Sequence, residues 1–324
     1  MRIHVQNDAH DPHFAITPAQ WAQAAELAGE PAHAVSFGDD PGALAAALQS
    51  AEMLIAGPAT LAAHRPLAAP HLRLIFCTAA GVDRLLPLDW LPAGAALLNN
   101  RGAHGAKVGE YVAMALLMLG SGLPAMLRNQ RAHAWRPLFT PTLRDRQVVV
   151  VGAGDLGGAA AGAARRFGAR VTGVRASGAP HPDFDRMVAA DALDSVLPGA
   201  DFLVLACPLT DATRHLLDAR RLALLPRHAG VVNVGRGALL DQAALAAALR
   251  EARLGGAVLD VVSPEPLPAG DPLWDAPNLI LTPHVAADDP TRYSAHTLEI
   301  VFRNLRAGRA GLAYPNRVDP GRGY

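Results

Sequence analysis

The chain has 324 residues, of which 51% are hydrophobic, and its 29 basic and 29 acidic residues leave a formal net charge of zero. This length predicts about two domains with ample apolar material for their cores. The charge balance argues against a nucleic acid or an anionic membrane as the main partner. Its two cysteines, Cys77 and Cys207, are too few for a disulfide framework or a metal cluster. We therefore expect no metal and a reducing, cytoplasmic location.

The chain up to residue 101 predicts a small open α/β domain, because short apolar strands alternate with helices. Residues 1–6 predict a first strand rather than a signal peptide. Thr17 and Gln20 have the spacing of a capping box, with proline at the first helical position, so a helix should begin there. Further strands are expected at 34–37, 53–56 and 72–76, with a helix at 42–49.

The most apolar tract, residues 111–127, lies within a long helical pattern that should begin near His104. Two glycines and Pro124 interrupt it, so it predicts a buried helix followed by a break rather than a membrane span. Residues 129–142 follow as an irregular segment that contains Trp135.

Four consecutive valines, 148–151, predict a buried parallel strand that leads into a glycine-rich turn. Gly152 permits a tight turn, Gly154 lets the backbone approach a pyrophosphate, and Gly157 lets the next helix pack closely on the strand. The N-terminus of that helix would direct unpaired N–H groups and its positive dipole end at the phosphates. The order of strand, turn and helix therefore predicts a dinucleotide site.

The next strand ends at Arg175, where an acidic residue would bond the ribose hydroxyls of NAD. A guanidinium pairs well with a phosphate, and the hydroxyl of Ser177 adds a second donor. These residues predict a preference for NADP, with NAD still possible. The alternative is a solvated arginine at a strand end, with the choice of cofactor made elsewhere.

Side chains that follow the later strands form the predicted site, because ligands of an open parallel sheet bind beyond the carboxyl ends of its strands. The strands are expected at 202–206, 231–234, 257–259 and 279–281, with a helix at 241–251 and a last helix at 291–305. The pattern leaves open which domain that last helix joins. The candidate side chains at this rim are Arg236, Asp260, Glu265 and His284.

The rim residues suit acid–base chemistry on a carboxylic acid. Arg236 lies between two glycines, and its planar fork suits a substrate carboxylate. His284 is a natural proton donor near neutral pH. Glu265, between two prolines, would hold the tautomer of a neighbouring His284 and favour its protonated form. The spacing alone does not establish that contact.

Together these motifs resemble the D-isomer-specific 2-hydroxyacid dehydrogenases. The resemblance covers nearly the whole chain in order, and within the family Arg175, Ser177 and the Trp135 region resemble the glyoxylate and hydroxypyruvate reductase branch. The segments that carry it are 78–83, 152–157, 232–241, 259–268, 282–286, 304–305 and 315–318.

The resemblance implies an α/β protein of two Rossmann-like or flavodoxin-like domains with parallel sheets, the cofactor domain being inserted in the substrate domain. Residues 1–101 and 286–324 would form the substrate (catalytic) domain, so the last helix returns to it, and residues 102–285 the dinucleotide-binding Rossmann domain. It also implies a homodimer formed through the cofactor domains, with no nucleic-acid or membrane partner.

The family pattern also assigns roles within the site. Arg236, Glu265 and His284 would be catalytic, and Asp260 would face the nicotinamide carboxamide. Backbone N–H groups of Ala80, Gly81 and Val82, with Arg236 and His284, would hold the substrate. The implied cofactor-binding set is Gly152, Gly154, Asp155, Leu156, Gly157, Arg175, Ser177, Cys207, Pro208, Thr213, Val234, Gly235, Arg236, Asp260 and His284.

The expected function is NAD(P)-dependent reduction of a small 2-keto acid, glyoxylate-like or hydroxypyruvate-like, to the D-2-hydroxy acid. Glu265, where formate dehydrogenases carry glutamine, argues against formate as the substrate. One alternative is a 3-phosphoglycerate dehydrogenase-like enzyme, which needs a second anion site and usually NAD. Another is a nucleotide-sensing binding protein without turnover. His104 is expected to be structural, and Lys107 has no assigned role.

Overall fold

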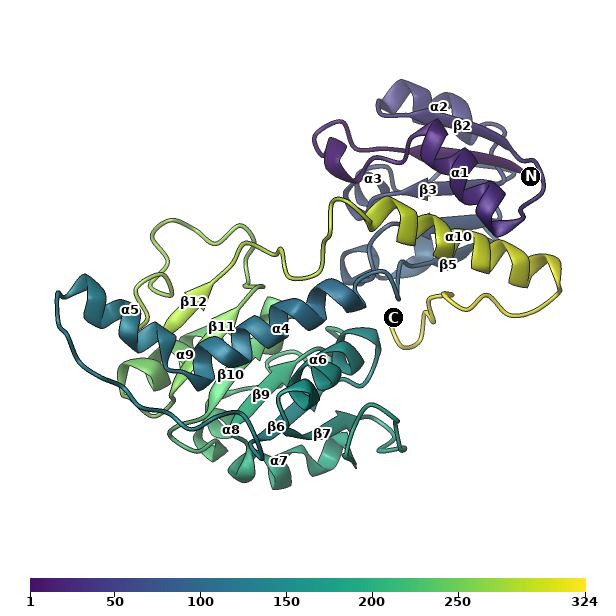
Figure 1. Ribbon diagram of the computed structural model, residues 1–324. Coiled ribbons are helices and arrows are strands. Elements are labelled where there is room, and N and C mark those ends of the chain that lie inside the picture. The colour runs from purple at the N-terminus through teal and green to yellow at the C-terminus, as the bar shows by residue number, and fades with distance from the viewer. The chain divides into compact units, whose positions relative to one another are not determined.

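The computed structural model describes residues 1–324 and divides the chain into two compact units. Unit 1 consists of residues 1–103 and 289–324, and unit 2 of residues 104–288. Each unit is a parallel β-sheet with helices on both faces (Figure 1). This confirms the predicted class of two α/β domains with parallel sheets.

The sheet of unit 1 has five parallel strands in the order β2-β1-β3-β4-β5. Chain order reverses next to β1, which is the flavodoxin-like arrangement. One face packs on α1 and α10, and the other on α2 and α3. The strands are β1 Arg2–Gln6, β2 Ala34–Gly38, β3 Met53–Ala56, β4 Leu74–Cys77 and β5 Ala96–Leu98, and the helices are α1 Pro18–Ala28, α2 Pro41–Leu48, α3 Pro58–Ala63 and α10 Tyr293–Arg309.

Local sequence signals set the ends of the first helix and the packing of the last. Thr17 and Gln20 form the predicted capping box at the start of α1, and Gly29 ends the helix with φ +62°. The C-terminal helix α10 packs on α1, and the rings of Trp21 and Phe302 meet edge to face with centroids 4.9 Å apart. The helix that the pattern left unassigned therefore belongs to unit 1.

The sheet of unit 2 has seven parallel strands in the order β12-β11-β10-β9-β6-β7-β8. Its chain order reverses between β6 and β9, the position at which doubly wound sheets bind ligands. The strands are β6 Gln147–Val151, β7 Arg170–Arg175, β8 Arg186–Ala189, β9 Phe202–Leu205, β10 Gly230–Asn233, β11 Gly256–Leu259 and β12 Leu279–Leu281. The helices are α4 Gly105–Gly120, α5 Leu123–Arg131, α6 Asp155–Arg166, α7 Leu193–Val196, α8 Ala219–Leu224 and α9 Gln242–Arg250.

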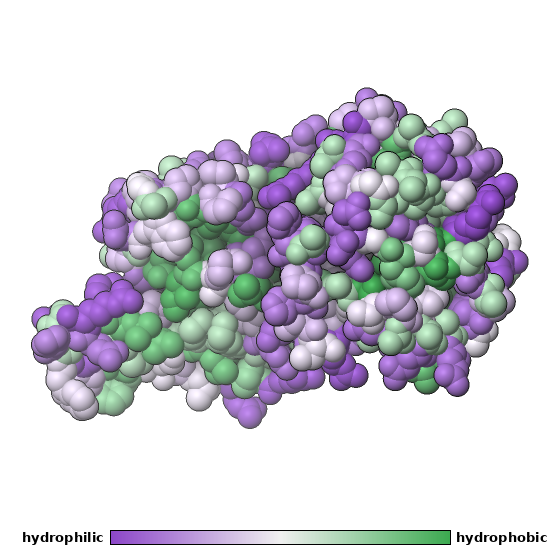
Figure 2. All heavy atoms as spheres, turned by 90° about the horizontal axis from the view of Figure 1, so that it is seen from above, coloured by the Kyte–Doolittle hydropathy of each residue, from purple (hydrophilic) through white to green (hydrophobic).

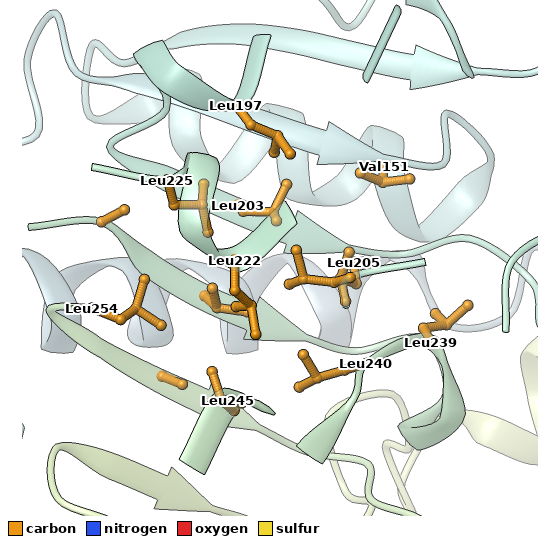
Figure 3. Packing of buried hydrophobic residues seen from close by; sticks show 14 of the residues in the cluster. Val151, Leu197, Leu203, Leu205, Leu222, Leu225, Leu239, Leu240, Leu245 and Leu254 are labelled. Atoms are coloured by element: carbon orange, nitrogen blue, oxygen red, sulfur yellow. The ribbon is translucent and has the colours of Figure 1, made fainter. Parts of the chain in front are cut away.

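Two apolar layers enclose the sheet of unit 2. On one face, strand residues such as Leu203 and Leu205 pack against Leu222 of α8 and Leu245 of α9, as Figure 3 shows. On the other face, α4 and the alanine-rich α6 cover Val148 and Val150. Because both faces of the sheet are buried, four consecutive positions of β6, residues 148–151, are apolar, and polar residues do not alternate with them.

The structure departs from the predicted elements at a few short segments. Residues 129–131 were expected to be irregular but complete the last turn of α5, which begins after the predicted break at Gly120–Gly122. No single helix is both long and apolar enough to cross a membrane, and α4 with α5 reach that length and composition only across a 63° bend. Elements that the sequence did not indicate are α3, α5, α7, α8, β5 and β8.

Candidate functional site

The carboxyl ends of β6 and β9 meet where the chain order of the unit 2 sheet reverses. Gly152 leaves β6 with φ +102°, and a Cβ at this position would lie 2.7 Å from the backbone of Ala206 and Cys207. Only glycine combines this φ with so close a neighbour. The turn therefore passes tightly over the end of β9 and leads into α6.

The other two glycines of the motif separate packing from ligand access. A Cβ on Gly157 would lie 1.7 Å from the carbonyl oxygen of Gly152, so the first turn of α6 packs directly on the glycine turn. A Cβ on Gly154 would meet nothing within 4 Å. This open backbone, beside a helix N-terminus that begins at Asp155 and Leu156, has the geometry that a pyrophosphate requires. The residues present therefore fit a dinucleotide.

Replacement of Gly157 by alanine is expected to abolish dinucleotide binding and lower the melting temperature, because the new methyl group overlaps the Gly152 carbonyl. Gly162, also on α6, is the matched control, since a Cβ there meets nothing within 4 Å. Gly162→Ala should bind NADPH like the wild type, because its methyl group meets no neighbour. Its melting temperature should not fall, because alanine favours helix over glycine. NADPH fluorescence titration and thermal melting of both variants measure this, and normal affinity in Gly157→Ala would contradict the packing.

Two predicted phosphate ligands lie at and just beyond the end of β7. Arg175 is the last residue of the strand, and its carbonyl accepts the N–H of Gly178 in the following turn. In that turn the Ser177 hydroxyl accepts the N–H of Ala179 at 3.3 Å, which leaves its own hydrogen available to a ligand. Both side chains are thus at the carboxyl edge of the sheet.

The loop after β9 carries Cys207, Pro208 and Thr213. Burial raises the pKa of the Cys207 thiol to about 12. The thiol is therefore neutral and does not act as a nucleophile. The Thr213 hydroxyl donates to the carbonyl of Pro208 at 2.8 Å and accepts the N–H of Thr210 at 2.7 Å. Thr213 therefore fixes the shape of this loop.

Arg236 is presented by a turn after β10 that a buried amide organises. The Asn233 side chain accepts the N–H of Gly235 at 3.1 Å and donates to the carbonyl of Arg236 at 2.9 Å. A Cβ at Gly237 would lie 2.0 Å from the backbone carbon of Val262, so this turn packs tightly on the loop after β11. The loop that carries Arg236 and the loop that leads to Glu265 are therefore neighbours. Asn233 was not among the predicted site residues.

Glu265 and His284 form the contact that the sequence left open. The Nδ1 atom of His284 lies 2.9 Å from one Glu265 carboxylate oxygen. The other oxygen of Glu265 accepts the N–H of Val262 at 3.1 Å. Because a carboxylate only accepts, Nδ1 carries a hydrogen and Nε2 is the nitrogen left to face a substrate. The His284 side chain is 44% exposed, so its ring is accessible.

Asp260 is buried, with 2% of its surface exposed. It lies beneath residues 282–286, which carry His284 and are called the histidine loop from here on. One of its carboxylate oxygens accepts the N–H of Val285 and the hydroxyl of Thr282, and the other accepts the N–H of Ala286. The carboxylate is thus engaged with the segment that carries His284. This is a contact that the family pattern did not indicate.

The predicted substrate loop, which includes Ala80, Gly81 and Val82, lies in unit 1 after β4. Buried side chains hold its backbone: Asn99 donates to the carbonyl of Ala80 at 2.9 Å, and Asn100 donates to that of Thr78 at 2.9 Å. These two asparagines were not among the predicted site residues, although their position directly after β5 was a signal for them.

His104 is buried at the start of α4. Its Nδ1 atom lies 3.3 Å from the carbonyl of Ala287 and 3.6 Å from the carboxylate of Asp288. Burial lowers the pKa of His104, against the opposing effect of Asp288. Lys107, a turn further along α4, pairs with Glu110 at 3.6 Å.

Residues 113–286 match the model of the NAD-binding domain of D-isomer-specific 2-hydroxyacid dehydrogenases. A protein of Streptomyces coelicolor, described as uncharacterised, is 38% identical over 259 residues, which cover 79% of this chain and 90% of that protein. The glyoxylate reductase of Korarchaeum cryptofilum is 31% identical over 261 residues, or 78% of this chain and 77% of that enzyme.

Solved structures of similar fold cover nearly the whole chain. A D-isomer-specific 2-hydroxyacid dehydrogenase family protein from Aeromonas salmonicida has a TM-score of 0.82 at 32% identity and covers 98% of this chain and 99% of its own. An NADPH-dependent glyoxylate/hydroxypyruvate reductase from Sinorhizobium meliloti, solved with NADP and sulfate, has a TM-score of 0.81 at 29% identity and covers 100% and 99%.

A doubly wound unit with a glycine turn, together with these matches, identifies a nicotinamide-dependent oxidoreductase. The chain belongs to the D-isomer-specific 2-hydroxyacid dehydrogenase family and is similar to its glyoxylate/hydroxypyruvate reductase branch.

Proposed function

We propose that this protein reduces a small 2-keto acid, such as glyoxylate or hydroxypyruvate, to the D-2-hydroxy acid (achiral glycolate from glyoxylate), with NADPH preferred over NADH. The single observation that carries the proposal is the 2.9 Å contact between His284 and Glu265 at the carboxyl edge of the dinucleotide-binding sheet. It provides an oriented proton donor on the same rim as Arg236 and the glycine turn. Relatives that are named glyoxylate or hydroxypyruvate reductases support the substrate class.

In the proposed reaction, reduced nicotinamide supplies a hydride to the keto carbon when it is bound. Arg236 orients the substrate carboxylate through its two parallel N–H donors. His284 donates the Nε2 proton to the oxygen that gains negative charge, and Glu265 holds the ring in the required tautomer through Nδ1. These three residues form the proposed catalytic set.

The remaining site residues keep their proposed roles. We assign residues 1–101 and 286–324 to the substrate domain and residues 102–285 to the cofactor domain, with the loop of Ala80, Gly81 and Val82 binding the substrate carboxylate through its N–H groups. The proposed cofactor ligands are the glycine turn, Arg175 and Ser177, and the residues that follow β9 and β10. Those last residues are Cys207, Pro208, Thr213, Val234 and Gly235.

A panel of glyoxylate, hydroxypyruvate, pyruvate and phenylpyruvate with NADPH and with NADH tests the proposal, with nicotinamide absorbance as the readout. We expect glyoxylate and hydroxypyruvate to give the highest kcat/KM of the four. Absence of turnover with all four, together with tight NADPH binding, would favour a nucleotide-sensing protein. A fifth substrate, phosphohydroxypyruvate, tests the other alternative, because its selective turnover would favour a 3-phosphoglycerate dehydrogenase-like enzyme.

Cofactor choice is expected to reverse in Arg175→Asp, because the change replaces a charge that attracts the 2′-phosphate of NADP with one that repels it. The ratio of kcat/KM for NADPH to that for NADH measures the effect. Arg186→Asp, which reverses a charge at the opposite end of the neighbouring strand β8, is the control and should leave the ratio unchanged. A wild-type protein that prefers NADH tenfold or more would rule out the role of Arg175.

We further propose that the protein is a homodimer formed through unit 2. The segment after α5 carries Trp135 at 98% and Phe139 at 94% exposed. In Figure 2, apolar surface coloured green lies among polar atoms at the end of unit 2 where α5 is found. Aromatic side chains so fully exposed are typical of protein–protein contact sites.

Replacement of Trp135 and Phe139 together by serine is expected to convert the dimer into a monomer, since their burial would supply much of the apolar contact. Sedimentation velocity across a concentration series measures the change in mass. Leu27→Ser is the matched control, because Leu27 is 82% exposed on α1 of unit 1. A wild-type protein that sediments as a monomer at all concentrations would contradict the dimer.

A further inference from the structure

Three hydroxyl and carboxyl groups form a chain beneath the histidine loop of unit 2. The hydroxyl of Tyr111, on α4, lies 2.5 Å from the hydroxyl oxygen of Thr282. Thr282 in turn donates to the Asp260 carboxylate at 2.7 Å. All three residues lie outside the set that contacts a substrate or carries the proton in the proposed reaction.

The direction of these hydrogen bonds follows from the hydrogens available. The single hydroxyl hydrogen of Thr282 goes to Asp260, so the Tyr111 hydroxyl is the donor to Thr282. Burial raises the pKa of Tyr111 to about 12, and the nearby Asp260 charge adds to the rise, against the opposing hydrogen bond to Thr282. The phenol therefore keeps its hydrogen and remains a donor through the neutral and moderately alkaline range.

The chain ends at the backbone of His284, which has an uncommon conformation. His284 has φ +57°, in the left-handed region that non-glycine residues rarely adopt. Its own N–H donates to the Asp260 backbone carbonyl at 2.8 Å, while the Asp260 carboxylate accepts the next two N–H groups, of Val285 and Ala286, each at 2.9 Å. Such a conformation persists when its surroundings fix it from several sides.

We propose that Tyr111 is a positioning residue for His284, acting through Thr282 and Asp260. The Tyr111 ring packs in the apolar layer between α4 and the sheet, so its hydroxyl projects from a rigid element. It orients the Thr282 hydroxyl, which holds the Asp260 carboxylate under the two N–H groups that follow His284. The catalytic consequence rests on the proposed function, in which His284 donates the proton. The structural part of the inference does not depend on it.

The first experiment removes single hydroxyl groups and leaves the packing intact. Tyr111→Phe keeps the ring, Thr282→Val keeps the shape without a donor, and Thr282→Ser keeps the donor. We expect Tyr111→Phe and Thr282→Val to lower kcat roughly tenfold with little change in KM or NADPH affinity, because displacement of a catalytic group by even about 1 Å costs up to 10²-fold. Thr282→Ser should retain most of the turnover. The double variant should be no slower than Thr282→Val, since Tyr111 acts only through Thr282.

The second measurement does not need turnover. Amide hydrogen exchange, followed by NMR, should accelerate at Val285 and Ala286 in Tyr111→Phe and Thr282→Val, while the strands of the sheet keep their protection. Tyr314→Phe in unit 1 is the matched control, because the Tyr314 hydroxyl makes no hydrogen bond within the protein. It should change neither exchange nor kcat.

The outcomes separate this inference from the proposed function. Wild-type exchange at Val285 and Ala286 in Tyr111→Phe would overturn the positioning role, whatever happens to turnover. A lower melting temperature with unchanged kcat and exchange would also overturn it, since that is what a purely structural hydroxyl predicts. If the wild type reduces none of the 2-keto acids, the proposed function fails, and the exchange measurement still decides whether Tyr111 positions the loop.

Discussion

Replacement of His284 by alanine is expected to lower kcat for keto-acid reduction by about 10²–10⁴-fold across the pH range, the usual contribution of general acid catalysis. The reason is that reduction creates an alkoxide, and the oriented imidazole at 2.9 Å from Glu265 is the proposed source of its proton. Steady-state reduction of glyoxylate or hydroxypyruvate, with NADPH binding measured separately, checks the result. Full activity in His284→Ala would remove this residue from the mechanism.

The Glu265→Gln variant separates the orientation of the His284 ring from its presence. The carboxylate holds Nδ1 of His284 at 2.9 Å through a charged acceptor, and glutamine offers only a neutral one. We expect kcat in Glu265→Gln to fall, but by less than in His284→Ala, because the ring is still present and only its orientation is weakened. NADPH affinity should be unchanged, which a fluorescence titration checks. Wild-type kcat in Glu265→Gln, with chemistry shown to be rate-limiting, would mean that Glu265 does not orient His284.

The second large effect is expected in Arg236→Lys, which keeps the positive charge but loses the bidentate fork. We expect a large fall in kcat/KM for the keto acid with NADPH affinity nearly unchanged, because Arg236 is assigned to the substrate carboxylate. Arg253→Lys is the matched control, since Arg253 pairs with Glu251 beyond α9. An equal loss of NADPH binding in Arg236→Lys would place Arg236 at the cofactor instead.

The glycine turn and the rim side chains were predictable because their signals are local. A run of valines, three glycines at fixed spacing and a helix form one continuous segment, and parallel strands bring the residues after each strand to one edge. The contact between His284 and Glu265 was anticipated only as a possibility, because the two residues are 19 positions apart and their approach depends on loop geometry. The structure provides that geometry.

The supporting residues could not be read from the sequence. Tyr111 lies in an apolar helix, where a tyrosine is indistinguishable from a core residue, and its hydroxyl partner is 171 positions away. Asn233 is inside a buried strand, and nothing in its neighbourhood marks its amide as the organiser of the Arg236 turn. The left-handed backbone of His284 was not predictable either. Pro283 favours extended backbone at the residue before it, Thr282, but does not set the conformation of the residue after it.

Short elements escaped prediction for a different reason. The helix α8 has six residues, too few for a helical period to emerge, and β8 begins with an exposed arginine and lacks the continuous buried run of strands such as β3. Residues 129–131, in the last turn of α5, form a polar run with no apolar face, so no helical pattern marks them. Tertiary packing, rather than local pattern, completes such elements.

The position of His104 beside Asp288 has a topological consequence. These are the first and last residues of unit 2, and their side chains approach to 3.6 Å. A segment of 185 residues, 104 through 288, therefore starts and finishes at neighbouring points. Interrupting unit 1 with such a segment adds little loop-closure entropy, because its ends already span a gap that a few residues could bridge. The same adjacency makes residues 104–288 a natural fragment for separate expression, and makes the two junctions suitable sites for circular permutation.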